Sequence, residues 1–436
     1  MNRWTFILPC LLLSLTVVAA CERKQNATTA TTTTSPDSCT VALARGQEWN
    51  DRDRAIALAQ QEARNGAQAR DALERLGYLY VARARVSNDA GDYTLADMTA
   101  ACLTASYPGD TAALLLKGHV LHQLHRFREA EQVARVLVAK RTVVLDYGLL
   151  GDALMEQGRL SEAGEAYQKM LDLKPFYQSY TRAAHLRWLK GDLDGATDAM
   201  RLAISSASPR DPESSAWAWT RLSAYELQAG RLRDAVTAAE TALRYEPDYA
   251  AALLAQGRVL MATNRPSDAL PVLRRAANLN PLPEYQWTLA DALRVQGNRA
   301  EADVTEQELQ KRGSISDPRT YSLYLATRRI ELPEAIALAA EELKTRADVF
   351  TLDAHAWALA ASGRIDEARE VMVRALAEGT QDARLFLHAG VIDAASGRHR
   401  EAKRWLKRAE RLRATLLPSE TTELTRHLTE NEGELR

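Results

Sequence analysis

Over most of this chain the apolar residues are spaced three and four positions apart, as on one face of an α-helix. Within that pattern a small residue is followed twelve positions later by alanine. The pairs are Gly118/Ala130, Gly151/Ala163, Ala184/Ala196, Ser223/Ala235, Gly257/Ala269, Ala290/Ala302, Ala356/Ala368 and Gly390/Ala402. Their first members stand 33, 33, 39, 34, 33, 66 and 34 residues apart. This period predicts a series of stacked helical hairpins.

Backbone breakers mark the ends of the predicted helices. Glycine suits the left-handed residue that ends a first helix, and it stands at Gly158, Gly230, Gly363 and Gly397. Proline cannot continue a helix, so second helices should close at Pro175, Pro247 and Pro281. The step of 39 contains a serine- and proline-rich insertion at 205–212, and the step of 66 spans a degenerate repeat centred on Ala335.

One copy of the repeat carries a full set of marker residues. In order they are Tyr147, Leu150, Gly151, Leu154, Ala163, Tyr167, Met170 and Pro175. This spacing resembles the tetratricopeptide repeat (TPR), in which aromatic, Leu-Gly, Ala and Pro positions recur at fixed offsets. The resemblance implies an all-α fold, an α-α superhelix (TPR solenoid) of about ten helical hairpins. It also implies a binding scaffold rather than an enzyme.

The repeats set the predicted domain boundaries. Repeats 1–7 occupy residues 71–313 and repeats 8–10 residues 318–413, with a hinge predicted at 313–318. The first repeat is irregular: nineteen residues separate Gly77 from Ala96, which requires a longer first helix or a longer turn. We expect an N-terminal capping helix within 39–70 and a C-terminal one within 414–436, because a solenoid must cover the apolar faces of its terminal repeats.

The N-terminus predicts export. Residues 1–20 form a signal peptide, since Phe6–Ala20 is almost wholly apolar and Arg3 is its single charge. The sequence Val-Ala-Ala-Cys at 18–21 resembles the lipobox of bacterial lipoproteins, which implies a lipid on Cys21. The alternative is an ordinary secretory signal that leaves Cys21 free. The polar residues 21–38 form a flexible tether. We therefore expect a lipid-anchored protein of the bacterial cell envelope that faces the periplasm. By analogy with enterobacterial sorting, Glu22 after the cysteine implies the outer membrane.

Two cysteines remain in the body of the chain, Cys39 and Cys102. In an oxidising compartment they could form a disulfide that clips the start of the ordered body onto the first repeat. The alternative is a small buried Cys102 and an unpaired Cys39. The sequence leaves both states open, because it does not give the Cα separation that a disulfide requires.

The TPR resemblance also implies which residues face the concave side. Ligands of that family lie against positions one and four past the small residue of each first helix. The predicted partner-binding groove comprises His119, His122, Asp152, Met155, His185, Trp188, Arg258, Met261, Trp287, Asp291, Arg294 and Trp357. Large amphipathic side chains with few charges are typical of binding hot spots. The Lys and Asn residues with which some TPR domains capture a C-terminal carboxylate are absent here. The alternative is that several of the aromatic residues pack between repeats.

Composition and motifs limit the chemistry. A formal net charge of −1 gives no field that would gather nucleic acid. Nucleophile-elbow, phosphate-loop, dinucleotide-binding and zinc-protease motifs are absent, so we predict neither an enzyme nor a cofactor. The alternative hypothesis is a metal- or small-molecule-binding accessory protein that uses His119, His122, Asp152 and His185. We predict no metal, because a metal site needs three or four supported ligands.

Our first hypothesis is a lipid-anchored TPR scaffold that binds a protein or peptide partner in its concave groove. Its contact with the membrane is expected through the lipid anchor only. TPR lipoproteins of this kind serve envelope assembly or polysaccharide export, and we expect one of these settings.

Overall fold

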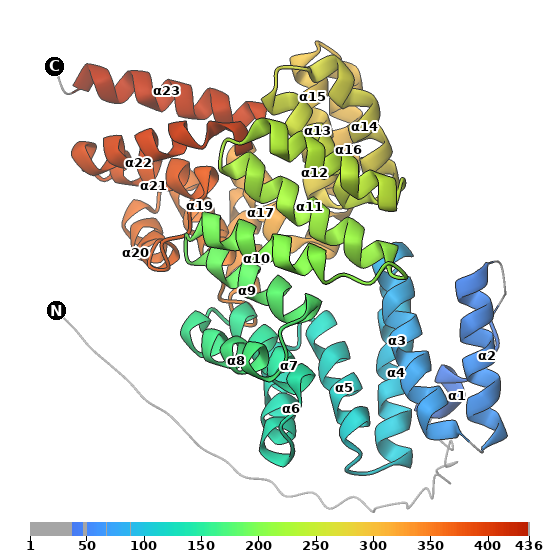
Figure 1. Cartoon of the computed structure of the whole chain (residues 1–436). Helices are drawn as coiled ribbons and strands as arrows, with labels where there is room; N and C mark the ends of the chain where they lie inside the picture. Colours follow the sequence, from blue (N-terminus) through green and yellow to red (C-terminus); the bar gives the residue numbers. More distant parts are fainter. Residues whose placement is uncertain (1–36, 47–49, 67, 88, 435–436) are drawn as a thin grey trace, which may run out of the picture. The chain divides into compact units, whose positions relative to one another are not determined.

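The described part of the protein is all-α. The computed structural model describes residues 37–46, 50–66, 68–87 and 89–434, and from Ser38 onward they form one compact unit. This part contains α-helices and one short 3₁₀-helix, without a β-strand (Figure 1). The predicted all-α fold of about ten hairpins is therefore confirmed. The predicted signal peptide, Cys21 and nearly all of the tether lie outside the described residues.

Ten consecutive helical hairpins make up residues 69–411 of the described chain. Their first helices are α3 (Ala69–Ser87), α5 (Thr111–Gln123), α7 (Val144–Glu156), α9 (Tyr177–Leu189), α11 (Pro212–Gln228), α13 (Ala250–Ala262), α15 (Pro283–Val295), α17 (Pro318–Arg328), α19 (Val349–Ala361) and α21 (Ala383–Ala395). Their second helices are α4 (Ala90–Ser106), α6 (Phe127–Lys140), α8 (Leu160–Leu173), α10 (Leu193–Ser205), α12 (Leu232–Tyr245), α14 (Pro266–Leu279), α16 (Arg299–Ser316), α18 (Leu332–Glu342), α20 (Ile365–Ala375) and α22 (His399–Arg411). The irregular first repeat has the longer first helix, of 19 residues.

Short elements flank the hairpins. The N-terminal region holds two helices, α1 (Ser38–Ala42) against α4 and α2 (Asp51–Asn65) against α3. After the last hairpin come the 3₁₀-helix η1 (Arg413–Thr415) and α23 (Pro418–Glu434). The segment predicted as a hinge is mostly helical, because α16 continues through Gly313 to Ser316 and α17 begins two residues later. The buried Gly313 lies so close to the Tyr321 ring that a Cβ would not fit.

Small residues bring the two helices of a hairpin together. Gly151 on α7 lies against the Tyr167 ring of α8, and Gly257 on α13 lies against Leu273 of α14, with no room for a Cβ in either case. The facing alanines Ala163 and Ala269 are fully buried. This close approach explains why the repeat requires a small residue at both positions.

One left-handed residue ends each of several first helices, as the turn pattern predicts. Gly158 and Gly230 have φ values of 76° and 73°. In the second and sixth hairpins His125 and Asn264, both with φ of 57°, take that place. His and Asn tolerate this conformation better than most side chains do. The position of His125 therefore has a backbone role, and its ring stacks on Phe127 with centroids 5.4 Å apart.

The later hairpins return to contact the earlier ones. Arg128 on α6 donates a hydrogen bond to the Lys344 carbonyl (3.1 Å), and Lys190 pairs with Glu378 at 2.8 Å. η1 contacts α11, α13 and α21, while α23 contacts α15 and α21 (Figure 1). The inner side of the middle hairpins therefore meets the protein's own later repeats and its C-terminal segment.

A disulfide joins Cys39 on α1 to Cys102 on α4. The two Cα atoms are 4.8 Å apart, and 63 residues separate the cysteines in the chain. Of the two states that the sequence leaves open, the structure contains the bonded one. The bond ties the N-terminal segment to the first hairpin, where Cys102 is also part of the buried core.

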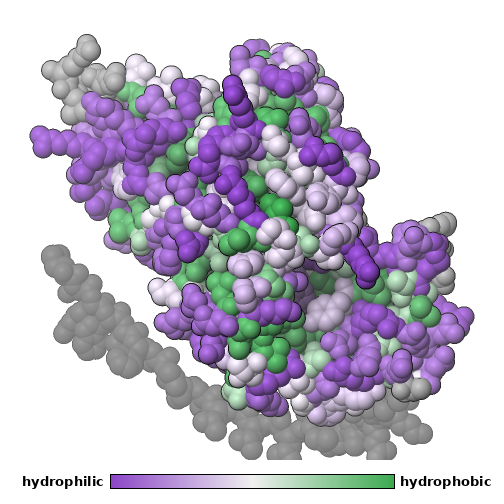
Figure 2. Space-filling model, in the orientation of Figure 1, coloured by the Kyte–Doolittle hydropathy of each residue, from purple (hydrophilic) through white to green (hydrophobic). Residues whose placement is uncertain are grey.

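Hydrophilic side chains dominate the surface over α22 and α23 (Figure 2). α22 carries six Lys and Arg residues against two Glu, whereas its Leu406 and Ala409 point into the core and are fully buried. This arrangement suits the end of a solenoid, where one face must cover the last repeat and the other must meet water. No helix in the described ranges has both the length and the apolar character that crossing a membrane requires.

Candidate functional site

A cavity of about 490 Å³ lies on the inner side of the middle hairpins. Helices α9, α11, α13 and α15 contribute to its wall, as do α17, α19, α21, η1 and Leu417. We call this space the central cavity. Its aromatic lining residues are Trp188, Trp217, Tyr225, Tyr249, Tyr285, Trp287 and Phe350, and its charged ones are Arg221, Arg258, Arg319, Arg384, Glu284, Asp353 and Asp382. Its size lies within the range of ligand pockets.

Trp188 connects the earlier and later hairpins at the edge of the central cavity. Its indole Nε1 donates a 2.6 Å hydrogen bond to Gln228 on α11. Its ring stacks on Phe350 of α19, with centroids 5.2 Å apart. Trp188, a predicted groove residue, therefore lies at the cavity, but a later repeat of the same chain already covers one face of its ring.

His185 lies beside Trp188 and next to a cation. The two rings are 5.2 Å apart, and Arg221 Nη2 lies 3.5 Å from His185 Nδ1. Burial, followed by the nearby Arg221 charge, lowers the pKa of His185 to about 3. The imidazole is therefore neutral at neutral pH, and it leaves the charge of Arg221 uncompensated.

The other arginines of the central cavity have acidic partners. Arg258 Nη1 lies 2.9 Å from Glu284, and Arg319 lies 3.1 Å from Asp348. Arg384 is paired with Glu420 of α23, and this carboxylate also accepts the backbone N–H of Leu417 at 2.8 Å. Glu420 thereby anchors the C-terminal segment against the cavity wall.

Two of the predicted groove residues, both on α15, are tied into ion pairs. Asp291 is 2 % exposed, and it accepts hydrogen bonds from the Ser419 backbone N–H (2.9 Å) and from Arg328 (2.8 Å). Burial raises the pKa of Asp291, and the Arg328 charge opposes this rise. Arg294 is exposed and pairs with Glu306 at 2.6 Å. Asp291 is thus a structural residue that fixes the start of α23.

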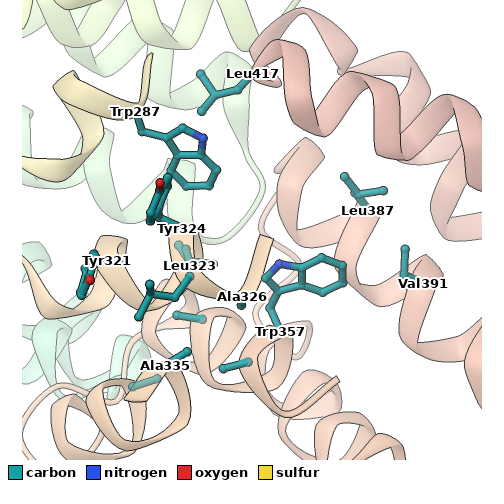
Figure 3. Packing of buried hydrophobic residues seen from close by; sticks show 14 of the residues in the cluster. Trp287, Tyr321, Leu323, Tyr324, Ala326, Ala335, Trp357, Leu387, Val391 and Leu417 are labelled. Atoms are coloured by element: carbon teal, nitrogen blue, oxygen red, sulfur yellow. The ribbon is translucent and has the colours of Figure 1, made fainter. Parts of the chain in front are cut away.

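Trp287 and Trp357 belong to the hydrophobic core instead of an open groove. Trp287 is 1 % exposed and lies between Tyr324 and Leu417 (Figure 3). Trp357 stacks on His388 at 4.1 Å and donates a hydrogen bond to Thr327 (3.0 Å). The prediction that both present an open groove surface is corrected for a physical reason. The repeats directly before and after Trp357 cover it, and Trp287 is covered by Tyr324 of the next repeat and by Leu417 of the C-terminal segment (Figure 3).

The remaining predicted groove residues lie at two other places on the inner side. Arg258 and Met261 line a neighbouring cavity of about 480 Å³, which shares Arg258 and Leu417 with the central cavity. Met155 lies on α7 and packs at the edge of the core near Tyr167. The places of these residues follow from the regular spacing of the first helices that the sequence predicts.

The histidines of α5 do not assemble a metal site. Burial, followed by the charge of His122, lowers the pKa of His119 to about 4. Asp152 is held by Arg182 at 2.6 Å and by the Tyr167 hydroxyl at 2.8 Å, so its carboxylate is already used. Within the described ranges no group of three or more His, Cys, Asp or Glu side chains is placed to hold a metal ion.

Sequence reasoning missed several cavity residues. Arg221 precedes the small residue Ser223, so the rule of one and four positions past it does not select Arg221. Phe350 and Arg384 come from late repeats, and no local pattern shows that these face α9 and α15. The one available signal was that Arg221 stands four positions after Trp217, so that the two large side chains share one face of the predicted helix.

Both the sequence and the fold are similar to known proteins. The family model described as Tetratricopeptide repeat matches residues 147–178, 221–282 and 254–308. Within residues 147–178 and 221–308 the chain therefore carries tetratricopeptide repeats. Among solved structures, the human IFIT1 dimer with m7Gppp-AAAA is 13% identical, with 75% of this chain and 76% of that chain covered and a TM-score of 0.50. This likeness concerns the fold alone.

Two smaller TPR structures also match. A TPR protein from Parabacteroides merdae is 17% identical, with 59% of this chain and 98% of that one covered, at a TM-score of 0.34. YrrB, a TPR protein with an unusual peptide-binding site, is 13% identical, with 45% and 97% covered, at a TM-score of 0.32. The comparison with curated protein sequences finds no match. TPR proteins are generally non-catalytic scaffolds, and the TPR fold of this chain suits protein–protein interaction.

Proposed function

We propose that this TPR protein holds a segment of a protein or peptide partner in its central cavity, while a lipid on Cys21 keeps it at the bacterial envelope. The observation that carries the proposal is the lining of the cavity, in which seven aromatic side chains stand among hydrogen-bonding groups. Aromatic residues and arginine dominate the binding energy of protein interfaces. A role in envelope assembly or polysaccharide export is the setting that we propose for this binding.

A peptide segment suits the cavity better than a folded domain does. The walls come from both early and late hairpins, so a partner must enter between them as an extended chain or a side-chain cluster. The neighbouring cavity shares Arg258 and Leu417 with it, which gives a longer segment a second place to continue. The metal-binding alternative has no supporting observation in the described residues, so we do not propose it.

Photo-crosslinking in intact cells tests the binding proposal. A crosslinking amino acid is placed at Ala224, which is exposed and lines the central cavity, and at the outer control position Val304, which is 57 % exposed on α16. We expect one partner to be captured from Ala224 and not from Val304. The captured segment, identified by mass spectrometry, should be lost when Trp217→Ala reduces the aromatic wall. Capture of the same proteins from both positions would contradict a site in the cavity.

Fractionation of cells tests the anchor separately. A Cys21→Ser variant should be released from the membrane in soluble form, because the lipidated side chain is absent. Retention of this variant in the membrane fraction after signal cleavage would contradict lipid anchoring. The binding proposal is independent of this result.

A further inference from the structure

One arginine of the central cavity differs from the other three. Arg258, Arg319 and Arg384 each pair with a carboxylate of the same chain. Arg221 has no carboxylate within 4 Å among the residues that the structure describes, and its Nε is buried without a hydrogen-bond partner there. A buried cation without a counter-charge is costly unless something else compensates it.

Neutral groups surround Arg221. Its guanidinium lies 5.3 Å from the ring centres of both Trp188 and Tyr225, which gives two cation–π contacts. His185, the third neighbour, carries no charge at neutral pH. Aromatic faces stabilise a cation by a modest amount only, so the half-buried guanidinium keeps most of its capacity to bind an anion.

Two further donors in the same wall lack acceptors. The Tyr225 hydroxyl and the Trp287 Nε1 are buried, and neither has a hydrogen-bond partner within the described part of the chain. Each of these side chains is only 1 % exposed. Buried polar atoms are nearly always satisfied in folded proteins, and leaving one unpaired costs about 1–3 kcal/mol. Neighbouring side chains enclose both of these donors, so the partly exposed Arg221 is the unpaired group that an acceptor in the cavity can meet directly.

We propose that the central cavity recognises a carboxylate of its peptide partner at Arg221. An apolar side chain of the peptide next to that carboxylate packs among the aromatic residues of the cavity. The carboxylate comes either from an Asp or Glu side chain or from the peptide C-terminus. This inference rests on the proposed peptide binding and deepens it. A carboxylate fits better than a phosphate, because the cavity contains no lysine and its lining includes three acidic residues. Those residues would repel a dianion and can accept peptide N–H groups.

The test uses four pools of eight-residue peptides with the purified full chain. One pool carries Glu and a free C-terminus, one Glu and a C-terminal amide, one Gln and a free C-terminus, and one Gln and an amide. We expect the neutral Gln-amide pool to be retained least, and the difference between the other pools tells which carboxylate is used. The affinity of the best peptide should fall roughly 10- to 100-fold in Arg221→Gln, as expected for a hydrogen-bonded charge.

Two control variants separate this effect from unfolding and from net charge. Arg233→Gln makes the same charge change on the exposed side of α12 and should leave the affinity unchanged. Arg221→Lys keeps the charge but loses the planar donor pair, so it should bind with intermediate affinity. Circular dichroism and the melting temperature report whether each variant is folded.

The outcomes distinguish this inference from the binding proposal. If all four pools bind equally to the wild type and to Arg221→Gln, peptide binding stands and the carboxylate site is overturned. If no pool binds, both proposals fail. If inorganic phosphate binds more tightly than the acidic peptides, at matched ionic strength and in an Arg221-dependent way, the site is a phosphate site and this inference is overturned.

Discussion

Arg346 Nε lies 2.6 Å from Glu156 Oε2, although 190 residues separate the two in the chain. Glu156 ends α7, and Arg346 precedes α19, so the pair joins the third hairpin to the region of the ninth. Arg346 also approaches Asp348 at 3.3 Å. Both side chains of the main pair are mostly buried, at 18 % and 15 % exposure, which protects the interaction from solvent screening.

Replacing Arg346 tests how much this contact between the third hairpin and the region of the ninth stabilises the fold. Arg346→Met should lower the free energy of unfolding by about 2 kcal/mol, because it leaves Glu156 partly buried without its partner. Arg233→Met, on an exposed surface of α12, should change it by less than about 0.5 kcal/mol. Urea denaturation followed by circular dichroism measures both values, and equal effects would contradict a closing role for Arg346.

The turn glycines provide a second test of the contact between the early and the late hairpins. Gly158 and Gly230 have nearly the same backbone conformation, with φ of 76° and 73°. A Cβ on Gly158 would collide with the Ala347 carbonyl oxygen, whereas a Cβ on Gly230 would meet nothing within 4 Å. Both alanine variants should lose about 1 kcal/mol from strain at positive φ. Gly158→Ala should lose a further 1–3 kcal/mol, roughly the cost of overpacking, in thermal or urea unfolding. Equal losses would show that the contact with Ala347 contributes nothing.

The buried histidines predict that stability falls with acid. Burial lowers the pKa values of His119 and His185 to about 4 and 3, below the ordinary value of 6.5. Between these values the unfolded chain binds protons that the folded chain does not bind, so stability is complete above pH 6.5 and declines below it. From pH 7 to 5 each histidine should account for up to about 2 kcal/mol of lost stability.

Histidine variants and urea titrations at the two pH values measure this effect. Most carboxylates stay ionised in that range, so the histidines dominate the change. His119→Gln and His185→Gln should each reduce the difference between pH 7 and pH 5. His427→Gln is a suitable control, because its ring lies on α23 beside Glu423 at 3.1 Å, away from the helices that carry His119 and His185. An unchanged pH difference in both variants would contradict the assignment.

The disulfide should contribute strongly to stability. It closes a loop of 63 residues between Cys39 and Cys102, and the chain-entropy relation for such a loop gives about 4 kcal/mol. The double variant Cys39→Ala/Cys102→Ala should therefore unfold at lower denaturant concentration. The melting temperature of the wild type should fall with dithiothreitol, whereas that of the double variant should not. A reductant effect of the same size in both would exclude the disulfide as its cause.

The hairpins were predictable because their determinants are local. Gly151 and Ala163 lie twelve residues apart within one hairpin, and their packing repeats at a period that can be read directly. Gly158 likewise marks its turn by residue type alone. These features depend on neighbours within about 34 residues, a distance over which a sequence pattern constrains the structure.

The cavity was less predictable because its determinants are distant. Trp188 meets Phe350 and Asp291 meets Ser419 only after many small rotations between successive hairpins have accumulated. A small change in rotation per repeat would separate these residues, and no short pattern encodes that angle. For the same reason Trp287 was assigned to an open surface although Leu417 covers it (Figure 3), whereas Trp357 is buried between the adjacent repeats. Arg221 was missed because the family positions used for counting exclude it.

The bond between Ser419 and Asp291 has a consequence for the order of synthesis. Ser419 is synthesised after all ten hairpins, yet it completes a wall begun by α15. Until then, the Trp287 side chain lacks the Leu417 cover that it has in the finished protein (Figure 3). A premature stop codon after Leu412 would therefore leave ten formed hairpins with an aromatic surface exposed to water, a species prone to self-association and to quality-control proteolysis.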